Sequence, residues 1–535
     1  MPAARLQRPG LWPGRSSVLA RRGAVAASQP LATQAGIEML RNGGNAIDAA
    51  IAAAAALCVV EPMSTGLGGD MFVLYWSAKD AKLKGLNGSG RCPQSLSWRT
   101  FARVGLNYIP QRGWKAVTVP GTVDGWWTLH QADGKLPFGD LLEPAIRYAR
   151  DGFPVSEVIA GHFESAPKVL QNDAARAVYL PGGRPPVYGQ ILKQPDLART
   201  LERIAQGGRD AFYRGEIASE MLAASQAEDG TLAAADFEAH ASTWVEPIQA
   251  HFQGLEVCEL PPNGQGVAAL LALNILSSQK LSDLRKHWPD LTHAMLEAIK
   301  LAFAERDVHV ADPERYAVPL KKLLSLTFAT HAGMTIDRAR AVPRAGSLVG
   351  DPDGDTVYLS AADGDGNLVS FINSLYMGFG SGLVAGKSGV MLQNRGACFS
   401  LQDGHPNRIE SGKRPFHTII PGFALRHGKP HLAFGVMGGF HQAQGHVQVL
   451  VNLMLHQMSL QEALSAPRFD FRTENFVAFE RDYPQELIQD LAGRGHQVVA
   501  NDQGPFGGAQ AIRILEGGVL EAASDPRKDG CAMGI

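Results

Sequence analysis

Cysteine and net charge are both scarce in this chain. Its five cysteines are odd in number and scattered, so neither a disulfide framework nor a CxxC metal site can be read from their spacing, and reduced thiols are expected. The net charge is −2 and the pI is about 6.8, which offers no basic field for nucleic acid or for an anionic membrane. We therefore expect no nucleic-acid partner and no membrane partner.

A hydrophobic run long enough to cross a membrane is also missing. The longest apolar stretch, Ala49 to Val60, is shorter than the roughly 20 residues that a spanning helix needs. The N-terminus is rich in arginine, and Arg21-Arg22 could pass for a twin-arginine signal, but no strongly apolar segment follows it. We predict that residues 1–22 are a disordered extension and that the protein is cytoplasmic.

Strand and helix patterns alternate along the chain without repeats. Two hairpins are predicted, Met71–Trp76 with Lys82–Leu86 and Tyr358–Ala362 with Leu368–Ile372. Pro30 and Gly43-Gly44 bracket a helix, Asn45 caps an alanine-rich one, and the region 138–335 is mostly helical by periodicity. This mixture indicates the α+β class or a layered αββα sandwich, and spacing alone does not choose between them.

The most informative segment runs from Gly354 to Ser360. Pro352-Asp353-Gly354 has the composition of a turn, and Val357-Tyr358-Leu359 favours a strand, so Thr356 stands where a loop gives way to a strand. If the bond from Asp355 to Thr356 were cut, Thr356 would own a hydroxyl and a free α-amine, and the amine could act as the general base for the hydroxyl. An ordinary strand threonine is the alternative interpretation of this segment alone.

Further motifs favour the nucleophile over the ordinary strand threonine as the interpretation of Thr356. They occur in one order along the chain: Gly23–Ala32, Gly43–Ala50, Glu61-Pro62, Gly66–Gly69, Val119–Thr122, Pro261–Gly266, Met437–Gly439 and Ser524–Arg527. With these motifs the chain resembles the gamma-glutamyltransferase family, whose members are N-terminal-nucleophile (Ntn) hydrolases that cut themselves before such a threonine.

The resemblance implies a fold and an assembly. The fold would be a four-layer αββα sandwich built from both fragments of a self-cleaved precursor. Cleavage between Asp355 and Thr356 would leave a large subunit, 23–355, and a small subunit, 356–535. The two fragments would form a heterodimer, with a dimer of such pairs as a further option. No cofactor and no metal are expected.

The resemblance also assigns the remaining catalytic groups. The glycine pair Gly438-Gly439 would form the oxyanion hole with bare backbone N–H groups, although a turn that needs positive φ is the alternative for such a pair. Eighteen residues after the nucleophile the family usually has a threonine whose hydroxyl bonds the nucleophile. Here the residue is Ser374, which keeps the hydroxyl.

Substrate recognition is where the chain departs from the family pattern. Members that use γ-glutamyl substrates carry an arginine for the α-carboxylate after the second strand, and here Ser89 takes that place. Arg91 lies two residues away and could substitute for it, or it could be a simple surface arginine.

The other pocket positions differ as well. Cys398 replaces the aspartate that pairs with the α-ammonium, Arg395 replaces a glutamine, Tyr376 replaces an asparagine, and His417-Thr418 replaces a serine pair. The site loses an anion and gains a cation, so it should favour an acyl group with a carboxylate and no amine. An internal salt bridge is the alternative role for Arg395.

These observations predict a threonine-nucleophile amidohydrolase or acyltransferase acting on a small carboxylate-bearing amide, oxamate or a glutaryl amide. The alternative is a glutathione hydrolase or gamma-glutamyl transpeptidase. A remote alternative is an unprocessed pseudoenzyme that serves as a binding protein. His293 and Glu297 share one helix face, but the sequence places no third metal ligand beside them.

Overall fold

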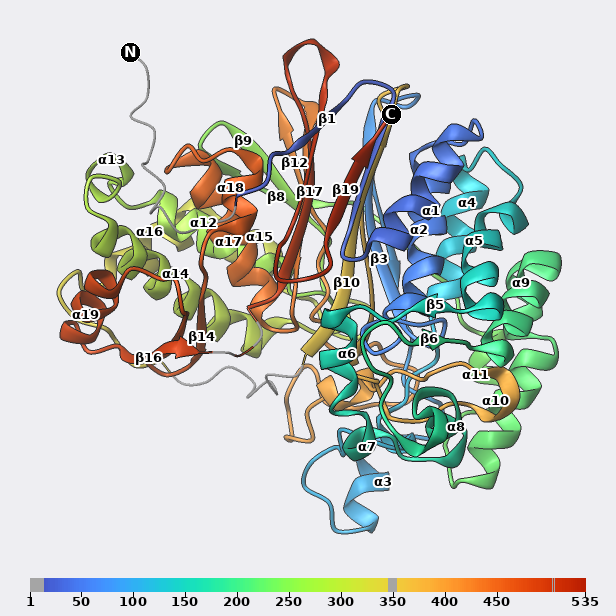
Figure 1. Cartoon of the computed structure of the whole chain (residues 1–535). Helices are drawn as coiled ribbons and strands as arrows, with labels where there is room; N and C mark the ends of the chain where they lie inside the picture. Colours follow the sequence, from blue (N-terminus) through green and yellow to red (C-terminus); the bar gives the residue numbers. More distant parts are fainter. Residues whose placement is uncertain (1–13, 345–353, 503, 505) are drawn as a thin grey trace.

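The computed structural model of the protein describes residues 14–344, 354–502, 504 and 506–535. Two antiparallel sheets stand face to face at its centre, with helices on both outer faces (Figure 1). This is the four-layer αββα sandwich of the Ntn-hydrolase type, as predicted. The predicted turn residues Pro352 and Asp353 lie outside the described residues.

The first sheet carries Thr356. Its strands, in spatial order, are β19 (Cys531–Gly534), β2 (Gly23–Ala27), β10 (Gly354–Asp363), β11 (Leu368–Met377), β3 (Asp70–Ser77), β4 (Lys82–Gly88) and β7 (Thr243–Val245). Both predicted hairpins, β3–β4 and β10–β11, are confirmed.

The second sheet carries the glycine pair at the end of one of its strands. Its spatial order is β1 (Val18–Ala20), β18 (Leu520–Ser524), β17 (Gly508–Ile514), β13 (Lys429–Met437), β12 (Gly422–Arg426), β9 (Leu255–Glu259) and β8 (Ile248–Phe252). Two small sheets complete the strands: β14 (Phe469–Thr473), β15 (Phe476–Glu480) and β16 (Gln497–Asp502), and β5 (Phe153–Pro154) with β6 (Ile191–Leu192).

Helices on the first sheet's outer face come from the first half of the chain. They are α1 (Pro30–Arg41), α2 (Ala46–Val60), α4 (Thr122–Asp133), α5 (Phe138–Asp151) and α9 (Pro195–Tyr213). Around them lie α3 (Trp98–Arg103), α6 (Glu157–Phe163), α7 (Ala166–Val169), α8 (Asp173–Tyr179), α10 (Glu216–Ala227) and α11 (Ala234–Glu238). Asn45 caps α2 in a capping box with Asp48. Every residue of α2 is buried, as expected for a helix that is apolar on all sides apart from Asp48 in its first turn.

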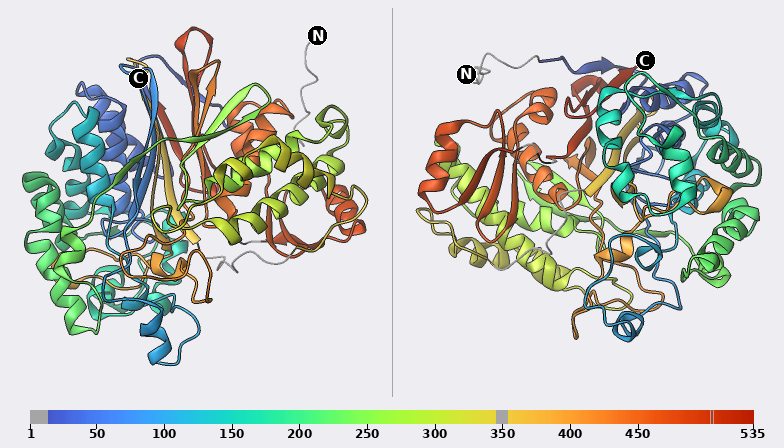
Figure 2. Two further views of the ribbon diagram at one scale, coloured as in Figure 1. Left: turned by 180° about the vertical axis from the view of Figure 1, so that it is seen from behind. Right: turned by 60° about the horizontal axis from the view of Figure 1, so that its bottom comes forward.

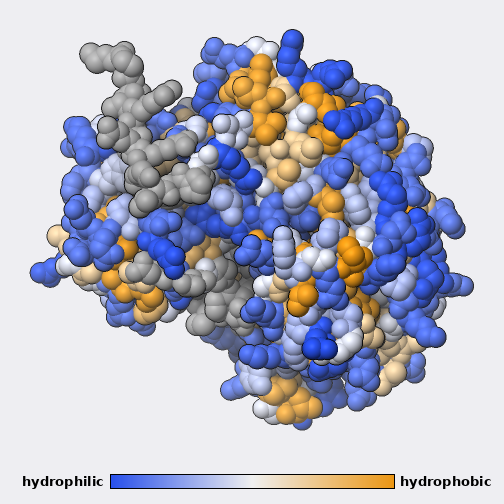
Figure 3. Space-filling view, in the orientation of Figure 1, coloured by the Kyte–Doolittle hydropathy of each residue, from blue (hydrophilic) through white to orange (hydrophobic). Residues whose placement is uncertain are grey.

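Helices on the second sheet's outer face include segments from both halves of the chain (Figure 2). They are α12 (Gly266–Ser277), α13 (Leu281–Leu284), α14 (Trp288–His309), α15 (Leu320–Leu323), α16 (Leu326–Met334), α17 (His441–Met454), α18 (Leu460–Ser465) and α19 (Gln485–Gly493). In the described residues, no helix is both long and apolar enough to span a membrane. The face drawn in Figure 3 is mainly hydrophilic, with apolar residues in several separate groups.

One prediction from the sequence needs correction, and a second is confirmed with an exception. Within the predicted N-terminal extension, 1–22, residues Val18–Ala20 form β1 and pair with β18, because this apolar segment completes the edge of the second sheet. The region 138–335 is mostly helical, but 243–259 forms β7, β8 and β9. These strands are short, and the edge strand β7 is only partly buried, so they gave a weak signal.

Candidate active site

Thr356 lies on β10, fully buried, at an irregularity of the first sheet. Asp355 pairs with Tyr376 and Val357 pairs with Asn373, so two residues of β11, Ser374 and Leu375, stand opposite Thr356 alone. Such bulges re-aim a side chain and are frequent beside active sites. The Thr356 hydroxyl donates a hydrogen bond of 2.6 Å to the carbonyl oxygen of Asp355.

Ser374 joins this hydroxyl to its surroundings. Its Oγ lies 3.0 Å from Thr356 Oγ1 and 3.0 Å from the carbonyl oxygen of Asp355. It also accepts a hydrogen bond of 2.8 Å from the backbone N–H of Tyr376. The spacing of eighteen residues thus brings the two hydroxyls together across the β10–β11 hairpin.

Arg395 is the charged group of this network, and it lies on a short 3-10 helix, Arg395–Cys398. It is fully buried, and its guanidinium donates to Ser374 Oγ at 3.3 Å and to Thr418 Oγ1 at 2.8 Å. The guanidinium carbon lies 4.5 Å from the centre of the Tyr376 ring, a cation–π contact. Among the residues that the structure describes, no carboxylate forms an ion pair with it, and its Nε has no hydrogen-bond partner.

Cys398 ends the same 3-10 helix and lies beside that guanidinium. Its Sγ lies 3.9 Å from Arg395 Nη1. Burial raises the pKa of the Cys398 thiol, and the lowering effect of Arg395 does not outweigh it. The thiol is therefore neutral and supplies no anion to Arg395, which has no carboxylate partner in an ion pair within the described part of the chain.

His417 is close to Arg395 but bonds to another group. Its Nε2 donates to Asp70 Oδ2 at 2.9 Å, and both side chains are fully buried. Burial, and next the positive charge of Arg395, lower the pKa of His417 to about 4, so the imidazole is neutral at physiological pH. The other oxygen of Asp70 accepts hydrogen bonds from the N–H of Gly90 and from Gln393.

The glycine pair Gly438-Gly439 ends β13 and precedes α17. Both glycines have positive φ, 120° and 56°, so the turn interpretation holds for the backbone. In the described residues, neither N–H has an acceptor, and both precede the positive end of the α17 dipole. Gln265 donates to the carbonyl oxygens of Thr418 and Gly439 at 2.7 and 3.0 Å, which ties the pair to the Arg395 side of the site.

Ser89 and Arg91, the substrate-binding candidates that follow the second strand of the first predicted hairpin, bond to other groups. Ser89 is buried, and its hydroxyl accepts a hydrogen bond from Asn263. Arg91 forms an ion pair of 2.6 Å with Glu314 and a longer one of 3.6 Å with Asp312. In the described part of the chain, neither residue forms a hydrogen bond or an ion pair with Thr356, Ser374 or Arg395.

Several residues of the network were missed from the sequence. Asp70 follows Gly68-Gly69 and opens a strand that is otherwise apolar, which is a signal that could have been used. Gln265, which holds Gly439, is also buried and belongs to a glycine-rich motif. Lys528 and His162, which face the Asp355 carboxylate, gave no local signal, because only the fold brings them there.

The helix face with His293 and Glu297 gains a third group in the structure. His496 lies close enough that the three side chains could share a metal ion. However, His293 Nδ1 and His496 Nε2 bond to each other at 2.9 Å, and Lys300 lies 2.6 Å from Glu297. A cation already neutralises the one carboxylate, which disfavours a metal ion here.

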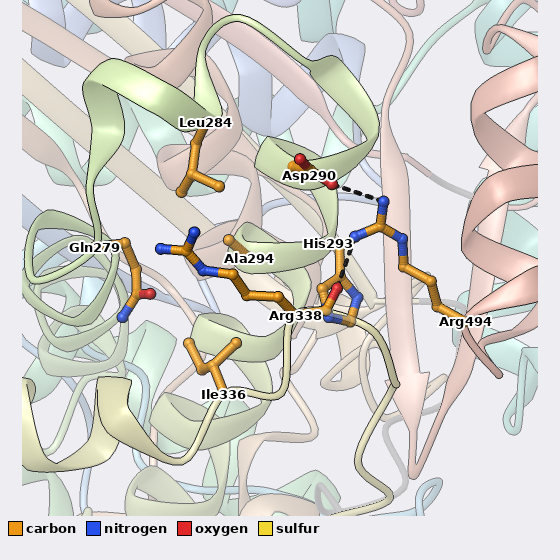
Figure 4. A pocket seen from close by; sticks show the side chains of 8 residues that line it. All are labelled: Gln279, Leu284, Asp290, His293, Ala294, Ile336, Arg338 and Arg494. Carbon is orange, nitrogen blue, oxygen red and sulfur yellow. Dashed lines mark hydrogen bonds and ion pairs between the residues drawn. The ribbon is translucent and has the colours of Figure 1, made fainter.

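A small pocket beside this cluster is separate from the Thr356 network. Figure 4 shows His293 on its wall with Arg494, which is bonded to Asp290. Its lining comes from α13, α14 and the neighbouring segments: Gln279, Leu284, Asp290, His293, Ala294, Ile336, Arg338 and Arg494. None of these residues contacts the groups around Thr356 in the described part of the chain.

Comparison with known proteins places the chain in a family. The Gamma-glutamyltranspeptidase family model matches residues 32–535. The glutathione hydrolase-like YwrD proenzyme of Bacillus subtilis is 38% identical over 97% of this chain and 99% of its own length. The oxamate amidohydrolase proenzyme of Klebsiella pneumoniae is 35% identical over 97% of this chain and 99% of its own length.

A solved structure agrees with these sequence relatives. The crystal structure of cephalosporin acylase from Bacillus halodurans superposes with a TM-score of 0.93 at 41% identity, covering 99% of both chains. The residues that the family model matches, 32–535, include the β10–β11 hairpin and the glycine pair. The chain therefore belongs to the gamma-glutamyltranspeptidase family of Ntn hydrolases and acyltransferases.

Proposed function

We propose that this protein is a self-processing amidohydrolase that cleaves a short amide bearing a carboxylate on its acyl group, with oxamate as the type substrate. The observation that carries the proposal is Arg395, a buried guanidinium without a carboxylate partner among the described residues. A buried charge without a counter-ion is costly, and a substrate carboxylate would supply the missing anion. The names of the relatives, an oxamate amidohydrolase and an acylase among them, support this class.

The proposed reaction begins after the bond between Asp355 and Thr356 is cut. The free α-amine of Thr356 takes the proton of its hydroxyl, and Oγ1 attacks the substrate carbonyl. The N–H groups of Gly438 and Gly439 stabilise the oxyanion, with Ser374 holding the nucleophile. The α-ammonium of Thr356 gives its proton to the amide nitrogen, which leaves as ammonia or an amine, and water then hydrolyses the acyl-threonine ester.

Arg395 sets the length of the acyl group. Its Nη2 lies 3.3 Å from Ser374 Oγ, which lies 3.0 Å from Thr356 Oγ1, so guanidinium and hydroxyl are close neighbours. In oxamate the carboxylate is bonded directly to the acyl carbon, so one small molecule reaches both groups. A glutaryl chain places several methylenes between them and must fold to do the same. We therefore rank oxamate-type amides above glutaryl amides.

The second candidate is a gamma-glutamyl amide, because the 38% identical relative is named glutathione hydrolase-like. Such a substrate brings an ammonium, which needs an anion. Cys398 is neutral, and Asp70 already accepts hydrogen bonds from His417, Gly90 and Gln393. This arrangement favours the substrate without the amine.

A panel of oxamate, glutaryl amide and gamma-glutamyl amide tests the assignment. Arg395→Gln should raise KM for the preferred carboxylate amide roughly ten- to a hundredfold, because a charge-assisted hydrogen bond is lost. Arg395→Lys is the matched control, because it keeps the positive charge but loses the planar fork of the guanidinium. Its KM should fall between the values of the wild type and of Arg395→Gln. A wild-type preference for gamma-glutamyl amides over their deamino analogues would overturn the assignment.

A further inference from the structure

Two titratable side chains, Lys528 and His162, lie against the carboxylate of Asp355, the residue that precedes Thr356. Lys528 Nζ lies 3.7 Å from Asp355 Oδ1, and His162 Nδ1 lies 3.6 Å from Asp355 Oδ2. Lys528 also lies 3.5 Å from Nε2 of the same histidine. Asp355 and Lys528 are largely buried, and His162 is half-buried, so these contacts are shielded from bulk water.

The charges of this cluster support one another. Burial would raise the pKa of Asp355, but the charges of Lys528 and His162 lower it below its usual value. The nearby hydroxyl of Ser64 and a hydrogen bond to the carboxylate from the backbone N–H of Thr356 lower the pKa further. Burial would lower the pKa of Lys528, but Asp355, Glu61 and Asp525 raise it. Lys528 and burial lower the pKa of His162. At neutral pH the cluster therefore holds an aspartate anion against a lysine cation.

This anion touches the bond that would be cut. Asp355 Oδ1 accepts a hydrogen bond of 2.9 Å from the backbone N–H of Thr356. On the other side of the same peptide unit, the Asp355 carbonyl oxygen accepts hydrogen bonds from the hydroxyls of Thr356 and Ser374. The peptide unit is thus fixed at its nitrogen and at its oxygen, which is the preorganisation that an intramolecular attack needs.

We propose that the Asp355 carboxylate, held by Lys528 and His162 as positioning residues, orients the scissile peptide unit and so sets the rate of self-cleavage. The proposal rests on the proposed function of Thr356. Oγ1 of Thr356 bonds to the carbonyl carbon of Asp355, and the peptide C–N bond between Asp355 and Thr356 breaks. The hydroxyl proton moves to the Thr356 nitrogen. Water then opens the ester, returns a proton to Oγ1 and leaves an α-carboxylate on Asp355.

The position of Lys528 in the sequence adds a condition to self-cleavage. It lies between β18 and β19, close to the C-terminus of the chain, and these strands pair with β1, β17 and β2. The clamp on Asp355 is complete only when these last strands have joined the sheets. Self-cleavage at the full rate thus requires both sheets to be assembled.

The test follows conversion of freshly purified full-length precursor on a denaturing gel over time. Lys528→Met should slow conversion roughly tenfold or more, as expected for losing a charge-assisted contact to the reacting unit. Lys528→Arg keeps the cation and should recover much of the rate. His162→Gln should slow conversion less, because Lys528 remains.

A double variant separates positioning from a merely structural role. In an Asp355→Asn background the clamped charge is gone, so adding Lys528→Met should change conversion little. Equal slowing by Lys528→Met in both backgrounds, or wild-type conversion in Lys528→Met, would overturn the clamp. Cleavage that persists in Thr356→Ala would instead refute the proposed function, whatever the clamp variants do.

Discussion

At the scale of single residues, the His417–Asp70 pair shows how burial sets protonation in this site. Both side chains are fully buried, and the imidazole donates to the carboxylate while Arg395 lies nearby. A protonated His417 would add a second cation beside the guanidinium. The neutral form therefore leaves Arg395 as the charge that faces a substrate anion.

This pair predicts a pH dependence of stability. The folded-state pKa of His417 is about 4, below its ordinary value of about 6.5. Between these values the unfolded chain binds more protons, so His417 favours the folded state above pH 6.5, and that contribution is lost as pH falls toward 4. His417→Gln should flatten this part of the pH profile of the unfolding free energy, measured by denaturant titration. An unchanged slope would mean that His417 is protonated in the fold.

At the scale of elements, the contact between β10 and β13 brings the hydroxyl strand and the glycine strand together. A side chain at Gly435 would collide with the Tyr358 ring, because its Cβ would overlap the ring atoms Cδ2 and Cε2. The bare glycine leaves room for the buried Tyr358 ring. Ser360 bonds to the carbonyl oxygen of Ala433, and Tyr358 lies against Gly435, so β10 and β13 run in opposite directions. The end of β13 at Gly438-Gly439 therefore lies near the start of β10.

Gly439→Val tests that end of β13. Valine is strained at the φ of 56° and would turn the backbone N–H away from the oxyanion, so kcat should fall roughly a hundred- to a thousandfold. Gly428→Val is the matched control, since Gly428 also has positive φ, 69°, in the open turn between β12 and β13. Turnover near wild type in Gly439→Val would put the oxyanion donors elsewhere.

The same elements show what the sequence could predict. The β10–β11 hairpin, the cap of α2 by Asn45 and strand β13 follow from local composition, because turn residues and strand formers specify them directly. The bulge opposite Thr356 does not, since it depends on the register of two strands. Nor do the His417–Asp70 and Lys528–Asp355 contacts, each of which joins residues more than a hundred positions apart.

At the scale of the whole molecule, the two predicted fragments share both central sheets. In the first sheet, β2 and β3 from 23–355 flank β10 and β11 from the other fragment. In the second sheet, β9 pairs with β12. Because each sheet is interleaved in this way, cutting one peptide bond breaks none of the strand pairing between the fragments. We expect them to stay together until the protein is denatured.

The central claim is that Thr356 becomes the first residue of a new chain. Mass spectrometry of the denatured wild-type protein should find a fragment that begins at Thr356 and ends at Ile535, while the native protein elutes as one particle that contains both fragments. Thr356→Ala should remain a single full-length chain. A wild-type protein that stays intact while it hydrolyses amides, or a fragment that begins at another residue, would contradict the account.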